Sequence, residues 1–288
     1  DGEGDGNTDT AVAEFELGFA FTPAESKWSA VAELSFDSSD TTTFDASAES
    51  SAAIFGAASA AESQAAINSA FGGNNSVEFE TVTISYQYSD TLSFTFGNIL
   101  SYQGFETYDA TGLYQFSYAG AGGSALYSAA YAVGASADGS IGDIDYGVWV
   151  GDTDSGTNSF EYLLAYNGIE NFTVKLIYAD DPGYETTNVW ASYDYGDFTF
   201  AAESVETEDG TGADVLDVQY LMVYYAMGDA GVTFRYTDGE DVVDYSKFTV
   251  SPSYAFSDSV FGLVELSQID ATGAEKVTEF AAELIYSF

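Results

Sequence analysis

Alternation of apolar and polar residues with a period of two is the feature that most constrains this 288-residue chain. In the last ten residues, one wholly apolar row consists of Phe280, Ala282, Leu284, Tyr286 and Phe288. The residues between them form a mixed row that includes Glu279 and Glu283. A β-strand places alternate side chains on opposite faces. The pattern therefore predicts a terminal strand with one apolar face and one partly charged face.

The same two-row pattern recurs along the chain and predicts an all-β protein with about 15 strands in this chain. The expected strands cover residues 11–22, 28–37, 81–88, 91–99, 125–136, 143–152, 158–168, 170–180, 186–195, 197–206, 214–227, 230–237, 245–256, 259–269 and 277–288. Tyr and Phe are abundant and Pro is rare, which is typical of strands joined by Gly and Asp turns.

Composition excludes several classes of function. Five basic residues against 47 acidic ones give a formal net charge of −42. A nucleic-acid backbone is therefore not a natural partner, and cations are the natural counterpart. The chain has no Cys and no His, which excludes disulfides, thiolate or imidazole metal sites and Ser-His-Asp or Cys-His catalysis. The carboxylate pairs Glu14 with Glu16 and Glu279 with Glu283 follow simple strand spacing, so we do not expect an enzyme.

Two kinds of protein alternate in this way, and the apolar rows alone do not separate them. In a secreted or surface β-rich adhesion or structural protein, the aromatic rows would form a soluble core. In a membrane barrel they would face lipid. Three features favour the barrel: polar rows rich in Ser, Thr, Gly and Glu, aromatic residues at strand ends, and alternating short and long connections. We therefore predict a transmembrane antiparallel β-barrel that forms a single domain over residues 1–288.

The strand count and the connections predict the barrel's layout. A single-chain bacterial barrel usually has an even number of strands, so we expect about 16, with the first lying upstream of residue 1. The two long outer loops are expected at residues 38–76 and 100–124, and Ser59, Glu62 and Gly72 predict a short helix near 60–71 in the first.

The stretch FTFGNILSYQGFETYDATGLYQFSYA, residues 94–119, and the aromatic strand that ends at Phe288 resemble the OmpL-like β-barrel porin family of Gram-negative bacteria. The resemblance implies an outer-membrane location, passive diffusion through a pore, and an assembly signal at Phe288 that the barrel-assembly machinery reads. It supplies no substrate, so a channel selective for siderophores or sugars remains an alternative. By analogy with general porins, we expect a homotrimer embedded in outer-membrane lipid and lipopolysaccharide.

If the apolar rows face lipid, the alternate rows line a lumen. The basic residues in those rows are Lys175, Arg235 and Lys247, which we expect to form a cationic patch on the wall. The acidic ones are Glu14, Glu16, Glu33, Asp37, Asp145, Glu161, Asp194, Glu203, Glu265, Glu279 and Glu283. In general porins the loop that narrows the pore lies where residues 100–124 fall, so Glu106 and Asp109 are candidate constriction residues.

The excess of acid predicts a weakly cation-selective pore, because a charge in a narrow channel is only partly screened. The alternative is that the three bases merely neutralise crowded carboxylates and stiffen the barrel. Acidic outer loops at residues 1–9, 205–217 and 237–244 predict loose Ca²⁺ or Mg²⁺ binding. We expect no tightly bound metal in the first of these loops, because Val12 stands where a calcium loop needs its bidentate Glu. We also expect no cofactor.

Overall fold

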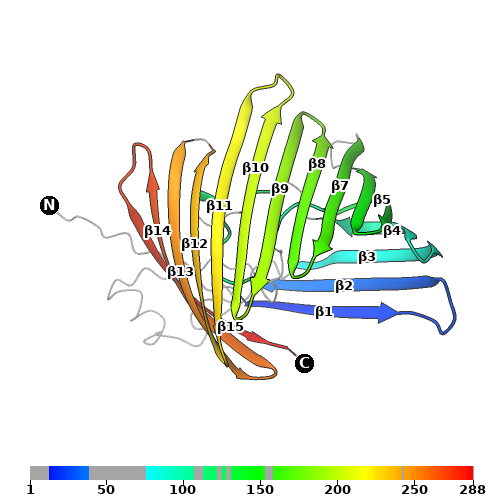
Figure 1. The fold of residues 1–288 in the computed structure, drawn as a ribbon, viewed down its shortest axis with the longest axis horizontal. Coiled ribbons are helices and arrows are strands. Elements are labelled where there is room, and N and C mark those ends of the chain that lie inside the picture. Colours follow the sequence, from blue (N-terminus) through cyan, green and yellow to red (C-terminus); the bar gives the residue numbers. More distant parts are fainter. Residues whose placement is uncertain are drawn as a thin grey trace, which may run out of the picture. The chain divides into compact units, whose positions relative to one another are not determined.

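A computed structural model describes residues 13–38, 76–106, 113–121, 125–127, 131–152, 158–241 and 243–287 (Figure 1). The regular elements of these residues are fifteen β-strands, each antiparallel to the next, in a sheet whose order follows the chain from β1 to β15. The predicted all-β antiparallel fold and its strand number in this chain are therefore confirmed. A sixteenth strand upstream stays a prediction. No helix in the described part of the chain is long and apolar enough to cross a membrane.

The strands are β1 (Ala13–Phe21), β2 (Trp28–Ser38), β3 (Ser76–Ser89), β4 (Leu92–Leu100), β5 (Tyr131–Ile141), β6 (Ile144–Asp152), β7 (Asn158–Ile169), β8 (Phe172–Asp181), β9 (Tyr184–Tyr195), β10 (Phe198–Asp209), β11 (Asp214–Met227), β12 (Ala230–Glu240), β13 (Asp244–Ser257), β14 (Val260–Ala271) and β15 (Val277–Tyr286). They fall into two compact units, Asp1–Ile84 and Ser85–Phe288. The first contains the β1–β2 hairpin, in which Leu17 pairs with Leu34. The second contains the strands from β4 to β15 and the site described below.

The two faces of the sheet in the second unit are inverted relative to a soluble protein. Along β13, Lys247, Thr249 and Ser251 are buried, whereas Phe248 and Tyr254 in the alternate row are 48% and 45% exposed. In β14, Glu265 and Ser267 are buried and Leu266 is exposed. β11 also exposes Leu221, but its buried row is apolar and consists of Val218, Tyr220 and Met222. Apolar side chains thus dominate the outward face, and the inward face is largely polar except at the apolar cluster on β11. This argues against the alternative of a soluble aromatic core, which would require the opposite arrangement.

Most predicted strands agree with the structure within a few residues, and residues 214–227 agree at both ends. The prediction of a strand at 125–136 with a turn at 137–142 was wrong. β5 begins at Tyr131 and runs to Ile141, where it pairs with Ile144 across a two-residue turn. Gly142 supplies the positive φ of 61° that such a tight hairpin needs. The loop at 38–76, with its predicted helix near 60–71, lies outside the described residues except at its ends.

Candidate functional site

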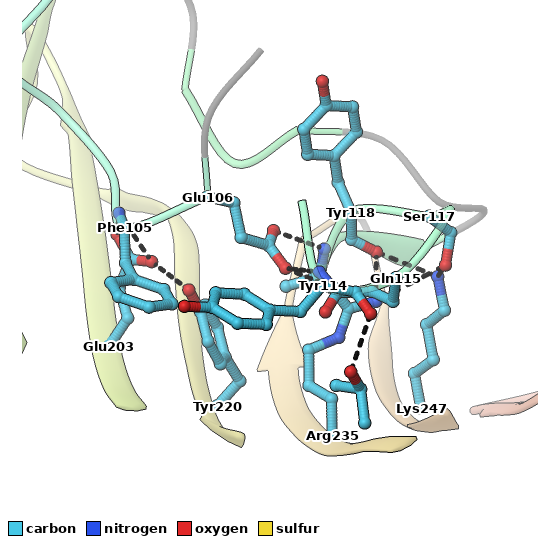
Figure 2. Close-up of polar contacts among 12 residues, drawn as sticks. Phe105, Glu106, Tyr114, Gln115, Ser117, Tyr118, Glu203, Tyr220, Arg235 and Lys247 are labelled. Atoms are coloured by element: carbon cyan, nitrogen blue, oxygen red, sulfur yellow. Dashed lines mark hydrogen bonds and ion pairs between the residues drawn. The ribbon is translucent and has the colours of Figure 1, made fainter. Parts of the chain in front are cut away.

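The connection between β4 and β5 folds against the inward face of the sheet in the second unit. We call its described parts, residues 101–106, 113–121 and 125–127, the inner segment. Its contacts are made with polar-row residues of strands between β5 and β14, and Figure 2 shows part of this contact area. Sequence reasoning placed the candidate constriction loop in this same region, at residues 100–124.

One end of the inner segment consists of residues 101–105 together with Tyr127, and we call it the first end. It is held by carboxylates that accept hydrogen bonds from uncharged donors. Ser101 Oγ and the Tyr102 amide each donate to the Glu161 carboxylate of β7, both at 2.7 Å. The Tyr102 hydroxyl donates to Asp138 of β5 at 2.5 Å. Burial, and then the neighbouring Asp138 carboxylate, raise the pKa of the Tyr102 hydroxyl. Tyr102 is therefore fixed at both its amide and its ring.

Glu203 of β10 is the centre of the first end. It is 3% exposed and accepts hydrogen bonds from the Tyr127 hydroxyl at 2.5 Å and the Tyr220 hydroxyl at 2.6 Å. Asn188 Nδ2 donates to it at 2.6 Å, and the Phe105 amide approaches both of its oxygens at 3.3 Å. Several donors thus compensate for burial of one carboxylate that has no ion-pair partner among the described residues.

The second end of the inner segment consists of Glu106 and residues 115–119. It is held by charged side chains of the wall. Arg235 of β12 forms a buried ion pair with Glu106. Glu106 also accepts hydrogen bonds from Gln115 Nε2 at 2.9 Å and from the Ala119 amide at 3.0 Å. Glu106 therefore connects two parts of the inner segment, residues 101–106 and 113–121, to each other and to the wall.

Ser117 and Tyr118 continue this attachment to Arg235 of β12 and Lys247 of β13 (Figure 2), and Ser117 also reaches β14. Lys247 Nζ donates to Ser117 Oγ at 2.8 Å and to the Tyr118 carbonyl at 2.9 Å, and Arg235 Nη2 donates to the same carbonyl at 2.8 Å. Glu265 accepts from the Ser117 amide at 2.9 Å and from its hydroxyl at 2.5 Å. Arg235 and Lys247 are 1% and 0% exposed, so their charges are enclosed between the wall and the inner segment.

Aromatic packing joins the two ends. The Phe105 ring stacks on Tyr114 at 6.3 Å between centroids and meets the Trp190 ring edge-on at 5.4 Å. Tyr114 in turn packs on Tyr224 of β11 at 5.1 Å. Burial is the main cause that raises the pKa of the Tyr114 hydroxyl. The main apolar cluster of the second unit therefore lies between the inner segment and its wall, where Leu126 and Tyr127 also pack.

The structure brings together six of the predicted site residues at these anchors: Glu106, Glu161, Glu203, Arg235, Lys247 and Glu265. The predicted patch of three bases is wrong in one respect, because Lys175 lies on β8 and Arg235 on β12, four strands further along the sheet. Lys175 contacts the Trp190 ring instead, at 4.8 Å from its centroid. Enclosure of Arg235 and Lys247 beside carboxylates agrees better with the alternative of charge neutralisation.

The other predicted residues lie apart from the anchors. Asp145 accepts a hydrogen bond from Asn167 at 2.7 Å and Asp194 from Thr199 at 2.6 Å. Exposed or half-buried side chains on other strands are those of Glu16, Glu33, Glu279 and Glu283. The positions whose side chains lie outside the described residues are Glu14, Asp37, Asp109 and Phe288.

Sequence reasoning missed the uncharged members of the site. Asn188 is fully buried, and its amide bridges the Gly104 amide at 2.9 Å and Glu203. Gln115 and Ser117 are buried as well. Asn188 lies in the middle of an inward row of β9, between Thr186 and Trp190. A side-chain amide at such a position is a signal that could have marked it. Asn188 carries no charge, so a criterion of charge in the polar rows does not select it.

The end of β10 and the start of β11 place three carboxylates close together. One oxygen from each of Glu206, Glu208 and Asp214 lies within 4.8 Å of the others. These residues belong to the stretch 205–217 for which the sequence predicts loose divalent binding. That binding stays a prediction.

Porins are among the solved structures whose fold this chain resembles. They include a double mutant of the porin from Rhodopseudomonas blastica, with a TM-score of 0.63, 16% identity, and coverage of 99% of this chain and 94% of that one. The anion-selective porin from Comamonas acidovorans has a TM-score of 0.59 at 12% identity and covers 98% of this chain and 87% of that one. Pseudomonas aeruginosa OccK5 has a TM-score of 0.57 at 11% identity, covering 98% and 84%.

Similarity at these identities shows the fold alone. No protein-family model matches the sequence, and no curated protein matches it significantly. The predicted porin fold is confirmed, and membership of the OmpL-like family in particular stays a prediction.

Proposed function

We propose that this chain is an outer-membrane porin of a Gram-negative bacterium that lets ions and small hydrophilic solutes diffuse through a water-filled channel. The observation that carries the proposal is the docking of the inner segment on the polar, inward face of a sheet whose outward face is apolar. A segment attached there occupies space that would otherwise be lumen, and so narrows the channel. The outward apolar face suits contact with lipid and lipopolysaccharide.

The preferred ion is proposed to be a cation, with weak selectivity. The chain carries a net charge of −42, and the two bases that anchor the inner segment are enclosed and matched by Glu106 and Glu265. Exposed acids such as Asp194 and Glu279 are therefore proposed to dominate the field that a permeating ion meets. The solved neighbour from Comamonas is described as anion-selective, so the shared fold does not decide the sign.

Planar-bilayer recording tests both parts of the proposal. The purified protein is expected to insert as stepwise, ohmic channels, and replacement of residues 102–126 by a short Gly-Ser linker should raise single-channel conductance. Under a KCl gradient, the reversal potential should show K⁺ to be more permeant than Cl⁻. Absence of channels would refute the porin function, and a greater permeability to Cl⁻ would refute only the cation preference.

A sugar-selective channel is the second candidate, and one observation favours it. Phe116 is 45% exposed although it belongs to the inner segment rather than to an outward strand row. Aromatic faces in a wet channel can stack on the apolar faces of sugar rings. Current fluctuations induced by a maltodextrin and lost in Phe116→Ala would support this candidate over general diffusion.

The proposed location and assembly follow from the same reasoning. We expect the protein in the outer-membrane fraction as a homotrimer, inserted by the barrel-assembly machinery with Phe288 as part of the signal. We expect a channel rather than an enzyme. Cell fractionation and the mass of the detergent-solubilised complex check the location and the oligomeric state.

A further inference from the structure

Lys175 has surroundings unlike those of the anchoring bases. It lies near the middle of β8 in an inward row and is half-buried. Its ammonium sits 4.8 Å from the centroid of Trp190, its register partner on β9. No carboxylate forms an ion pair with it within the described part of the chain. An ammonium over an aromatic face is held by attraction to the ring's negative face, and this contact leaves its positive charge without a carboxylate to neutralise it directly.

The aromatic contact places Lys175 at the edge of the inner segment. Trp190 is 8% exposed because the Phe105 ring of the inner segment packs against it at 5.4 Å. Lys175 lies on the strand next to Trp190, beside this covered area rather than beneath it. Its charge therefore borders the part of the wall where the inner segment is docked.

The neighbouring inward positions leave room beside the ammonium. The register row that crosses β6, β7 and β8 contains Asp145, Ala165 and Lys175 in turn. Ala165 is small and buried, and the Asp145 carboxylate already accepts a hydrogen bond from Asn167. On this side of Lys175 the row therefore contributes one small side chain and one carboxylate, and the bulky neighbour, Trp190, lies on the other side.

The remaining bases differ in position. Arg235 and Lys247 are enclosed by the inner segment. Lys276 lies between β14 and β15 and pairs with Asp270 of β14 at 2.7 Å. Its side chain is 60% exposed. Lys27 lies in the turn between β1 and β2. Of the bases on the inward strand rows that the structure describes, Lys175 is thus the one that presents its charge to the lumen.

We propose that Lys175 is the contact point for anionic groups in this channel and limits its cation selectivity at the edge of the inner segment. The inference rests on the proposed porin function. A fixed positive charge at that place attracts carboxylate- or phosphate-bearing solutes and repels cations. Because Arg235 and Lys247 are enclosed beside carboxylates, the charge of Lys175 is proposed to be the main one that opposes the acids of the inward rows.

The test is a reversal-potential measurement under a KCl gradient with charge changes at Lys175. Lys175→Gln should raise the ratio of K⁺ to Cl⁻ permeability by roughly twofold, as expected for one charge several ångströms from the ion path. Lys175→Arg should stay near wild type. Lys276→Gln removes an exposed charge outside the strands and should leave the ratio unchanged.

A second arm uses the absence of cysteine from the chain. Lys175→Cys channels, already inserted in the bilayer, are exposed to a methanethiosulfonate reagent that attaches an ethylammonium group. The thiolate of the cysteine introduced at position 175 attacks the reagent's sulfenyl sulfur and displaces methanesulfinate. The mixed disulfide that forms restores a positive charge and should return the ratio of K⁺ to Cl⁻ permeability toward wild type. This comparison uses the same channels before and after reaction, so a folding defect cannot produce it.

Unchanged selectivity in Lys175→Gln and in the modified Lys175→Cys channels would overturn the inference while leaving the porin function intact. Wild-type protein that forms no channels would overturn both. Potassium phosphate as the anionic probe should reduce wild-type current more than Lys175→Gln current, and equal reduction would also count against the inference.

Discussion

The two ends of the inner segment are attached to the same wall by different chemistry. At the first end, the donors to Glu161 and Glu203 within the described part of the chain are all uncharged hydroxyl, side-chain amide and backbone groups. At the second end, Glu106 pairs with Arg235. Lys247 donates to the Ser117 hydroxyl, which in turn donates to Glu265. A buried carboxylate can thus be stabilised either by enough neutral donors or by a base. The two solutions should fail differently when one partner is removed.

The largest effect is expected for Arg235→Ala at the second end. It leaves Glu106 buried without its base, which typically costs about 3–5 kcal/mol of stability. Urea unfolding in detergent measures the loss. A cysteine at Ala119, whose side chain is fully buried, reports undocking, because maleimide should react with it faster when Arg235 is replaced. The single Ala119→Cys variant is the reference for both measurements.

The double variant Glu106→Ala/Arg235→Ala sharpens this prediction. Removing both charges leaves none uncompensated, so it should be more stable than Arg235→Ala alone. A double variant that is at least as destabilised as the sum of the two single variants would contradict the assignment of Arg235 and Glu106 as a coupled pair.

An intermediate effect is expected for Glu203→Gln at the first end. The amide keeps the side chain's shape but replaces one acceptor oxygen by a donor. Because the hydroxyls of Tyr127 and Tyr220 donate to different oxygens, one of them loses its acceptor, at a cost of about 2 kcal/mol. Maleimide labelling at Ala119→Cys should change little, because the second end remains attached. Labelling as fast as in Arg235→Ala would show that the two ends are not independent.

The smallest effect is expected for a difference between two variants, Gly104→Ala and Gly183→Ala, which tests the backbone of the first end. Gly104 has a φ of 95°, and a Cβ there would run into the Tyr127 ring. Gly183→Ala is a matched control, because Gly183 has a φ of 92° but open space around it. Backbone strain alone costs on the order of 1–3 kcal/mol at either position. Gly104→Ala should therefore be the more destabilised of the two in urea unfolding, and equal losses would exclude the Tyr127 contact as a cause.

Much of the fold and part of the site could be predicted because they depend on local pattern. Period-two alternation located nearly all the strands and placed Glu203, Arg235 and Lys247 in inward rows. The prediction failed at β5, where Leu126 and Tyr127 continue an apolar pattern but pack in the inner segment instead. An apolar pair looks the same in a strand and in a docked loop, so local pattern could not separate them.

Sequence by itself determined which residues share a face, because alternation along a strand leaves no other choice. It could not assign partners across the fold, since Glu106 and Arg235 are 129 positions apart and their meeting depends on how the inner segment lies on the wall. Only the tertiary structure decided that Arg235 and Lys247 are enclosed while Lys175 stays open. The physical reason is that coverage by a distant segment, and not the residue's own strand, sets whether a charge is neutralised or presented.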